Sequence, residues 1–104
     1  NDHGYSYEIY REIFDRILTT LIDMEKGVEI NTSALARGMR EPNPCIGILR
    51  RYRALGGEIV TVGSDAHKPG QIAHAFDRAA EILKDCGFRY YVVYEKRNPS
   101  FYKL

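Results

Sequence analysis

The sequence predicts an α/β fold in which three parallel strands alternate with three helices. Three short runs of β-branched, aromatic or other apolar residues lie about thirty residues apart, and an amphipathic segment bridges each pair of runs. Two consecutive strand–helix–strand units form right-handed crossovers and a parallel sheet. A parallel barrel takes about 250 residues, and this chain has 104. We therefore expect residues 1–104 to be the C-terminal fragment of a single α/β barrel domain.

The composition is that of a globular chain without a nucleic-acid or membrane partner. Hydrophobic residues make up 44% of it, and no apolar run is long enough to span a bilayer. The 15 basic and 14 acidic residues are spread along the chain, whereas nucleic-acid binding needs a basic excess on one face. Cys45 and Cys86 fit neither a disulfide framework nor a metal spacing, and no signal peptide is present, so we expect a cytoplasmic protein. The chain begins with Asn1 and not with Met, which favours a piece of a longer protein.

Helices are predicted at about residues 6–26, 44–56 and 69–87. In the first, apolar residues recur three or four positions apart, which is the spacing of a helix that packs one stripe on a core. These residues are Tyr10, Ile13 or Phe14, Ile17, Leu21 and Met24. Pro44 and Pro69 suit the first turns of the second and third helices, and glycines follow all three. The expected solvent-facing cations of the second helix are Arg50, Arg51 and Arg53.

Strands are predicted at 28–31, 58–63 and 90–95, and a short aromatic tail follows the last one. In the first strand, Glu29 and Asn31 share one face and two apolar residues share the other. A polar pair on one face fits the interior of a barrel that carries a site, and it equally fits a solvated edge strand. These four residues do not decide between the two.

The segment 32–43 has no periodicity and is predicted to be a loop at the carboxyl end of the first strand. Its Arg37 and Arg40 are candidates for holding a phosphate, because the guanidinium fork matches phosphate oxygens in a bidentate manner. The alternative is ordinary surface charge. Elsewhere, His74 is expected at the surface and Cys86 in the core.

Asp65 and His67 follow the second predicted strand directly. In extended backbone both side chains leave the same side of the strand as that of Thr61, the side on which Gly63 also lies. A carboxylate and an imidazole at the carboxyl end of a parallel strand could share one metal ion, because ligand sites of α/β sheets lie at that end. The alternative is that Asp65 caps a turn or a helix while His67 is half-exposed.

Three sequence motifs occur in order along the chain: Glu-Ile-Asn-Thr-Ser at 29–33, Gly-Gly-Glu-Ile-Val-Thr-Val-Gly-Ser-Asp-Ala-His at 56–67, and Cys-Gly-Phe at 86–88. With them, residues 7–99 resemble the C-terminal part of the PHP (polymerase and histidinol phosphatase) family, in its histidinol-phosphate phosphatase branch. The resemblance implies a distorted (β/α)7 TIM-like barrel that holds up to three divalent ions (zinc, iron or manganese). Asp65 and His67 would be two of the metal ligands. The other ligands belong to His-x-His, His and Glu motifs that this chain does not contain.

The resemblance also implies that the full-length parent is a phosphoric monoester hydrolase. It would convert L-histidinol phosphate to L-histidinol in histidine biosynthesis, using water that the metal ions activate. The expected ligand is a small-molecule phosphate ester. Candidates for holding its phosphate or orienting it are Arg40, Arg37, Asn31 and Lys68.

Two alternatives to this function remain open. One is another PHP-family phosphoesterase with a different substrate. The other is a non-catalytic, oligomeric α/β module, because a catalytic metal needs about three protein ligands and this chain supplies two. We therefore expect the isolated chain to be inactive. We also expect it to associate with itself or with its missing N-terminal part, because a small open sheet has exposed edges.

Overall fold

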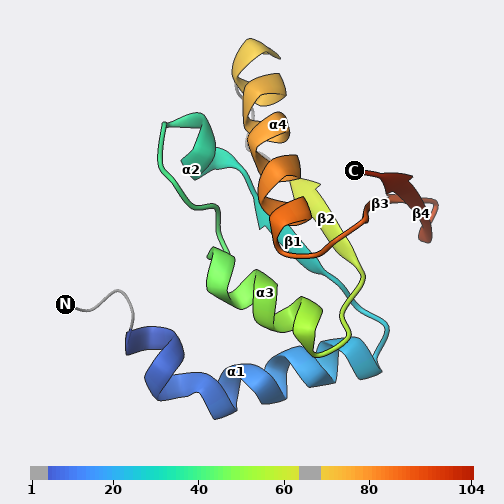
Figure 1. Cartoon of the computed structure of the whole chain (residues 1–104). Helices are drawn as coiled ribbons and strands as arrows, with labels where there is room; N and C mark the ends of the chain where they lie inside the picture. The colour runs from blue at the N-terminus through green and yellow to red at the C-terminus, as the bar shows by residue number, and fades with distance from the viewer. Residues whose placement is uncertain (1–4, 64–68) are drawn as a thin grey trace.

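The computed structural model describes the backbone of residues 5–63 and 69–104 and the side chains of residues 10–63 and 74–104. The elements in these ranges are α1 (Tyr5–Asp23), β1 (Val28–Asn31), α2 (Ser33–Ala36), α3 (Ile46–Ala54), β2 (Val60–Gly63), α4 (Pro69–Asp85), β3 (Tyr90–Glu95) and β4 (Asn98–Lys103). In Figure 1, α1 packs on α3 at one end of the molecule, and α2 packs on α4 toward the other end. Within the described residues, no helix has the length and apolar character needed to cross a membrane.

β1 and β2 form a parallel pair, as the sequence predicts. The register places Val28 opposite Val60 and Asn31 opposite Gly63, so the carboxyl ends of both strands lie at the same edge. Ile30 and Val60 are fully buried. They therefore mark the face of the pair on which the helices pack.

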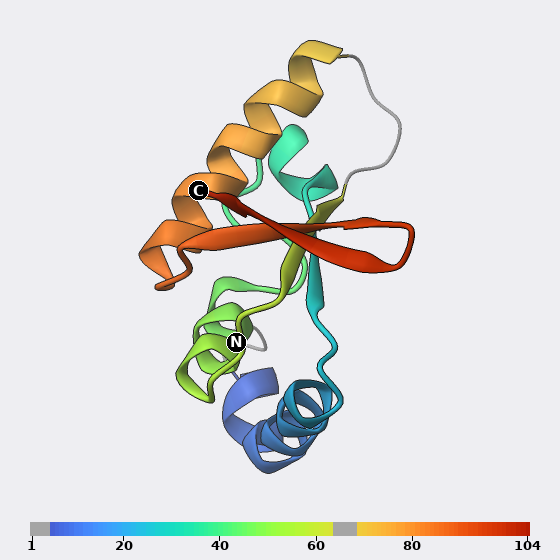
Figure 2. The ribbon, with the colours of Figure 1, turned by 90° about the vertical axis from the view of Figure 1, so that its right-hand side faces the viewer.

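The prediction of a third parallel strand is wrong. β3 pairs in antiparallel fashion with β4, a strand in the segment that was expected to be a tail. The turn between them consists of Lys96 and Arg97, whose φ angles of 51° and 69° are those of a two-residue hairpin turn. Figure 2 shows this hairpin crossing the direction of β1 and β2. The described residues thus contain an α/β arrangement with two parallel strands, and the barrel stays a prediction.

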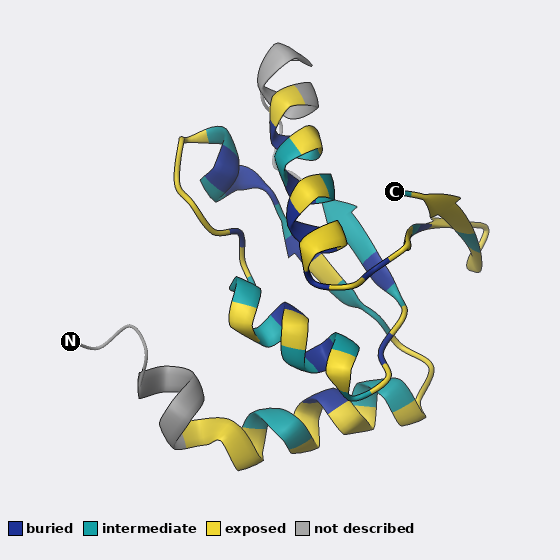
Figure 3. Ribbon diagram, viewed as in Figure 1, coloured by how far each residue is buried: buried dark blue, intermediate teal, exposed yellow. Residues whose placement is uncertain are grey.

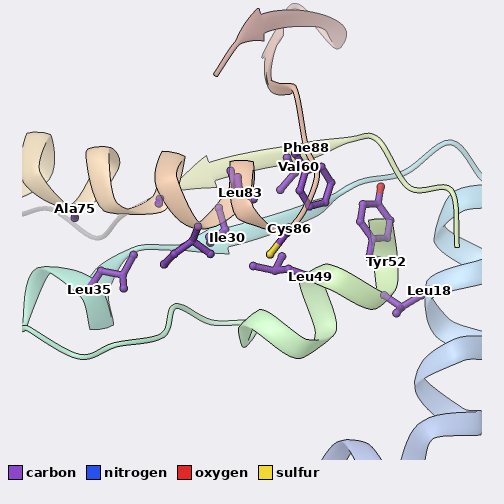
Figure 4. Packing of buried hydrophobic residues seen from close by; sticks show 12 residues of the cluster. Leu18, Ile30, Leu35, Leu49, Tyr52, Val60, Ala75, Leu83, Cys86 and Phe88 are labelled. Carbon is purple, nitrogen blue, oxygen red and sulfur yellow. The ribbon is translucent and has the colours of Figure 1, made fainter. Parts of the chain in front are cut away.

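One cluster of buried side chains joins the helices to β1 and β2 (Figure 4). Its members are Leu18, Ile30, Leu35, Leu49, Tyr52, Val60, Ala75, Ala79, Ile82, Leu83, Cys86 and Phe88. The rings of Tyr52 and Phe88 stack within it, with centroids 6.2 Å apart. Cys86 belongs to this core, as predicted, whereas His74 is exposed on α4, also as predicted.

The face of α1 that packs on the core is not the one that the apolar spacing predicts. Tyr10, Ile13, Ile17 and Met24 are 46–57% exposed, and Leu18 is the buried residue of this helix. Figure 3 shows the outer side of α1 as largely exposed. The helix contacts α3, and Phe14 and Leu21 of the predicted stripe are half-buried, so only part of that stripe faces solvent in the described structure.

The segment around the second helix also differs from the expectation. α2 is a single helical turn inside the predicted loop, and α3 begins at Ile46, whose amide donates to a carboxylate oxygen of Glu41 at 2.9 Å. Two of the arginines expected in solvent have protein partners. Arg51 forms a bidentate ion pair with Asp15 of α1, in which its Nε and Nη2 donate to the two carboxylate oxygens at 2.9 and 3.0 Å. Arg53 donates to two backbone carbonyls.

Candidate functional site

The shared carboxyl edge of β1 and β2 is held together by one backbone carbonyl. The oxygen of Gly63 accepts a hydrogen bond from the amide of Thr32 at 2.9 Å and another from its hydroxyl at 3.1 Å. Thr32 is almost completely buried, so these bonds are shielded from water. The end of β2 is thereby fixed to the start of the segment that follows β1.

Asn31 helps to shape this edge, and part of its side chain is already in use. Its Oδ1 accepts from the amide of Ser33 at 2.8 Å, an Asx-type turn that begins α2. Its backbone also bridges to Asn43, with N–O distances of 2.8 and 3.4 Å. Among the described residues its side-chain amide nitrogen has no partner, and this is the atom that could still bind a substrate oxygen.

Glu29 is a functional candidate that the sequence reasoning did not select. It lies opposite Thr61 in the register, on the face away from the core, and it is exposed. Its carboxylate leans toward the carboxyl edge and lies against Gly63, where the Cβ of any other residue would collide with it. The described part of the chain provides no ion-pair partner for this carboxylate. The signal in the sequence was its alternation with Asn31.

Arg37 and Arg40 both lie in the exposed segment that follows α2. The backbone amide of Arg37 ends α2 by donating to the carbonyls of Ser33 and Ala34, at 3.2 and 3.1 Å. In the described structure neither guanidinium has an ion-pair partner, so both cations remain available to an anion. Their phosphate-binding role stays a prediction.

Asp65, His67 and Lys68 lie outside the described residues. Strand β2 ends at Gly63, two positions before Asp65. The side chains described in the structure include no group of three or more His, Cys, Asp or Glu residues that could hold a metal ion.

Several surface hollows of the described structure lie away from this edge. Two of them border Glu58, just before the start of β2, and extend to Phe101 of the hairpin. One is lined in addition by Arg53 and Arg89, the other by Lys26 and Arg97. They open at the amino ends of the strands, the opposite end from the one at which α/β proteins bind ligands.

Comparison with known proteins identifies relatives of one kind. Over 91 residues the chain is 36% identical to a probable histidinol-phosphatase of Thermotoga maritima, a match that covers 88% of this chain and 39% of that protein. Over 100 residues it is 34% identical to a probable histidinol-phosphatase of Clostridium acetobutylicum (93% of this chain, 37% of that protein). A histidinol-phosphatase of Saccharomyces cerevisiae matches over 92 residues with 29% identity, covering 86% of this chain and 28% of that protein.

The chain thus spans less than two fifths of the length of each of these relatives. No family model matches it. What the comparisons establish is that most of this chain is similar to part of proteins named histidinol-phosphatase.

Proposed function

We propose that the chain is part of a metal-dependent phosphatase of the PHP family, and that the complete enzyme hydrolyses L-histidinol phosphate to L-histidinol. The observation that carries the proposal is the 36% identity to the Thermotoga maritima protein over 88% of this chain. The structure supports it by joining the ends of β1 and β2 in a parallel edge that leads directly to Asp65 and His67.

In this proposal Asp65 and His67 are metal ligands, and zinc, iron or manganese ions are the cofactor. A carboxylate oxygen and an imidazole nitrogen suit such ions. Divalent ions bound there lower the pKa of water so that hydroxide is available near neutral pH. The described residues supply no complete metal site, so further ligands must come from other segments.

The remaining roles belong to groups around the same edge. Arg37 and Arg40 carry exposed positive charge beside the carboxyl end of β1 and would neutralise the phosphate. Asn31 would orient a substrate oxygen through its free amide nitrogen, and Lys68 is a further candidate. The substrate is a small phosphate ester, and the partner that completes the site is the remaining part of such an enzyme.

A chimaera tests the proposal. The matched 91 residues of the Thermotoga maritima protein are replaced by the corresponding residues of this chain, and hydrolysis is measured with manganese or zinc. We expect turnover of L-histidinol phosphate in preference to phenyl phosphate. Asp65→Asn and His67→Asn should each lower kcat/KM by about 100-fold or more, because even the residues that support metal ligands are worth 10–100-fold. His74→Asn, at an exposed position of α4, is the matched control.

The outcomes separate the alternatives. Equal turnover of both esters by the chimaera would contradict the histidinol phosphate assignment and favour another phosphoesterase of the family. A folded chimaera, with native circular dichroism and no phosphatase activity, would contradict the enzyme proposal and favour a non-catalytic module. The 104-residue chain by itself is expected to show no turnover.

A further inference from the structure

Glu29 is the one carboxylate on the outward face of β1 and β2. That face comprises Glu29 and Asn31 of β1 with Thr61 and Gly63 of β2. The other three are uncharged, so the negative charge of Glu29 is not neutralised within the strand pair. The helices pack on the opposite face, which leaves this carboxylate free to meet a ligand.

The position of the Glu29 carboxylate depends on Gly63, its neighbour on β2. Although Glu29 pairs with Thr61 in the register, its carboxylate lies beside Gly63, two residues nearer to the carboxyl edge. The space it fills exists because Gly63 has no side chain. The negative charge is thereby held at the end of β2 that leads to Asp65.

Positive and negative side chains occupy different places around the carboxyl edge of β1 and β2. Arg37 and Arg40 follow α2, on the loop beyond β1, whereas Glu29 lies back on the strand face. L-histidinol phosphate has the same polarity: a phosphate dianion at one end, and an ammonium group on the neighbouring carbon. A carboxylate set back from the phosphate-binding cations is the group that recognises such an ammonium.

We propose that Glu29 determines substrate specificity by pairing with the ammonium group of an amino-alcohol phosphate. This inference rests on the proposed function. Glu29 acts on binding and takes no part in the proton transfers of hydrolysis. It distinguishes an amino-alcohol phosphate from a phosphate ester of the same shape that lacks the amine.

The test compares two esters in the chimaera described above. One is L-histidinol phosphate, and the other is 3-(imidazol-4-yl)propyl phosphate, which has hydrogen in place of the amino group. Glu29→Gln keeps the shape of the side chain and removes its charge. Glu29→Gln should lower the preference for the amine, measured as kcat/KM for L-histidinol phosphate divided by kcat/KM for the ester without the amino group, by about tenfold or more. A hydrogen bond to a charged group contributes enough free energy to give a preference of that size. Gly63→Ala, which pushes the carboxylate aside, should change the ratio in the same direction.

Two controls make the result specific. Glu58→Gln removes an exposed carboxylate near the amino end of β2 and should leave the ratio as it is. Titration calorimetry with L-histidinol and with 3-(imidazol-4-yl)propanol gives a readout that does not depend on catalysis. Glu29→Gln should weaken binding of the amine and have much less effect on the alcohol that lacks it.

The inference is overturned if Glu29→Gln lowers kcat/KM equally for both esters, or if the ratio and the binding of L-histidinol do not change. In those cases an active parent chimaera leaves the phosphatase proposal standing. A parent chimaera that is folded and hydrolyses neither ester overturns both proposals together.

Discussion

A single buried phenol holds the amino ends of the two parallel strands. The hydroxyl of Tyr52 donates to the carbonyl of Ile59 at 2.9 Å and accepts from the amide of the same residue at 3.2 Å. It also lies 3.5 Å from the carbonyl of Lys26. Burial raises the pKa of this tyrosine above its ordinary value, so the hydroxyl stays protonated and can donate at any physiological pH. A Cβ on Gly57 would collide with the ring, so this position between α3 and β2 requires glycine.

Removing this hydroxyl should destabilise the fold. Tyr52→Phe leaves the amide of Ile59 without the hydroxyl oxygen that it donates to, and it leaves the carbonyl of Ile59 with only the hydrogen bond from the amide of Val28. We expect the free energy of unfolding to fall by about 1–2 kcal/mol. Urea denaturation followed by circular dichroism measures it. Tyr94→Phe, which removes a hydroxyl from an exposed tyrosine of β3, is the control and should be close to neutral. Equal stability of the two variants would show that water replaces the lost bonds.

At the scale of elements, one ion pair fastens α1 to α3. The guanidinium of Arg51 binds both carboxylate oxygens of Asp15. Its hydrogen bond holds the pKa of Asp15 below the ordinary value. An acid whose pKa is lower in the folded state stabilises the fold above its unfolded pKa, and this contribution disappears as the pH falls through the folded pKa. The pair therefore stabilises the protein at neutral pH and not in strong acid.

Asp15→Asn should accordingly lower the free energy of unfolding by an amount that depends on pH. We expect a lower urea midpoint than that of the wild type at pH 7, and a difference that shrinks as the pH falls below the ordinary pKa of an aspartate, about 4. Asp23→Asn, at an exposed position of the same helix, controls for the general effect of removing a negative charge. A difference independent of pH would mean that packing and not the ion pair links the two helices.

The β3–β4 hairpin is a pair of strands that the sequence patterns did not predict. Apolar spacing indicated the approximate positions of most elements, although not of α2 and β4, and β1 occupies residues 28–31 as predicted. The partner of β3 did not follow, because spacing says nothing about the direction of pairing. Its turn is Lys96-Arg97, with positive φ at both positions, where Asn-Gly is the usual sequence. The turn signal was therefore missing, although the turn itself is a common one.

At the scale of the whole molecule, many large apolar side chains of the described residues are exposed to solvent. On α1 the exposed residues are Tyr10, Ile13 and Ile17, with Met24 just beyond its end, and on the hairpin they are Tyr90, Val93, Tyr94, Phe101 and Tyr102. Monomeric proteins seldom expose apolar side chains in such groups. Such exposure is expected if another chain or another part of a longer protein covers both groups.

The chain alone should therefore self-associate. Sedimentation velocity at increasing concentration is expected to show dimers or larger species. Ile17→Glu should shift the distribution toward monomer, because it places a charge in the centre of the exposed apolar group of α1. Thr19→Glu adds the same charge to another exposed position of this helix and should have little effect. A stable monomer at high concentration would contradict the expectation.

The candidate site was predictable in part. Position in the chain and strand alternation were enough to place Asn31 at the carboxyl edge, and the structure puts it there. They were not enough to single out Glu29, because its approach to Gly63 depends on the register between two strands that lie about thirty residues apart. The sequence was enough to locate Arg37 and Arg40 on a loop, but it does not give their distance from a ligand.

Tyr52 connects the backbone segments that precede β1 and β2, and this limits where residues can be inserted or deleted in the chain. Inserting one residue between Lys26 and Val28 would turn Glu29 inward and expose Ile30, because successive side chains of a strand point to opposite faces. Since the phenol bridges the segments that precede both strands, slippage cannot absorb such an insertion. Insertions and deletions among homologues should therefore gather beyond the carboxyl ends of the strands, where they can diversify ligand choice while the frame beneath stays the same.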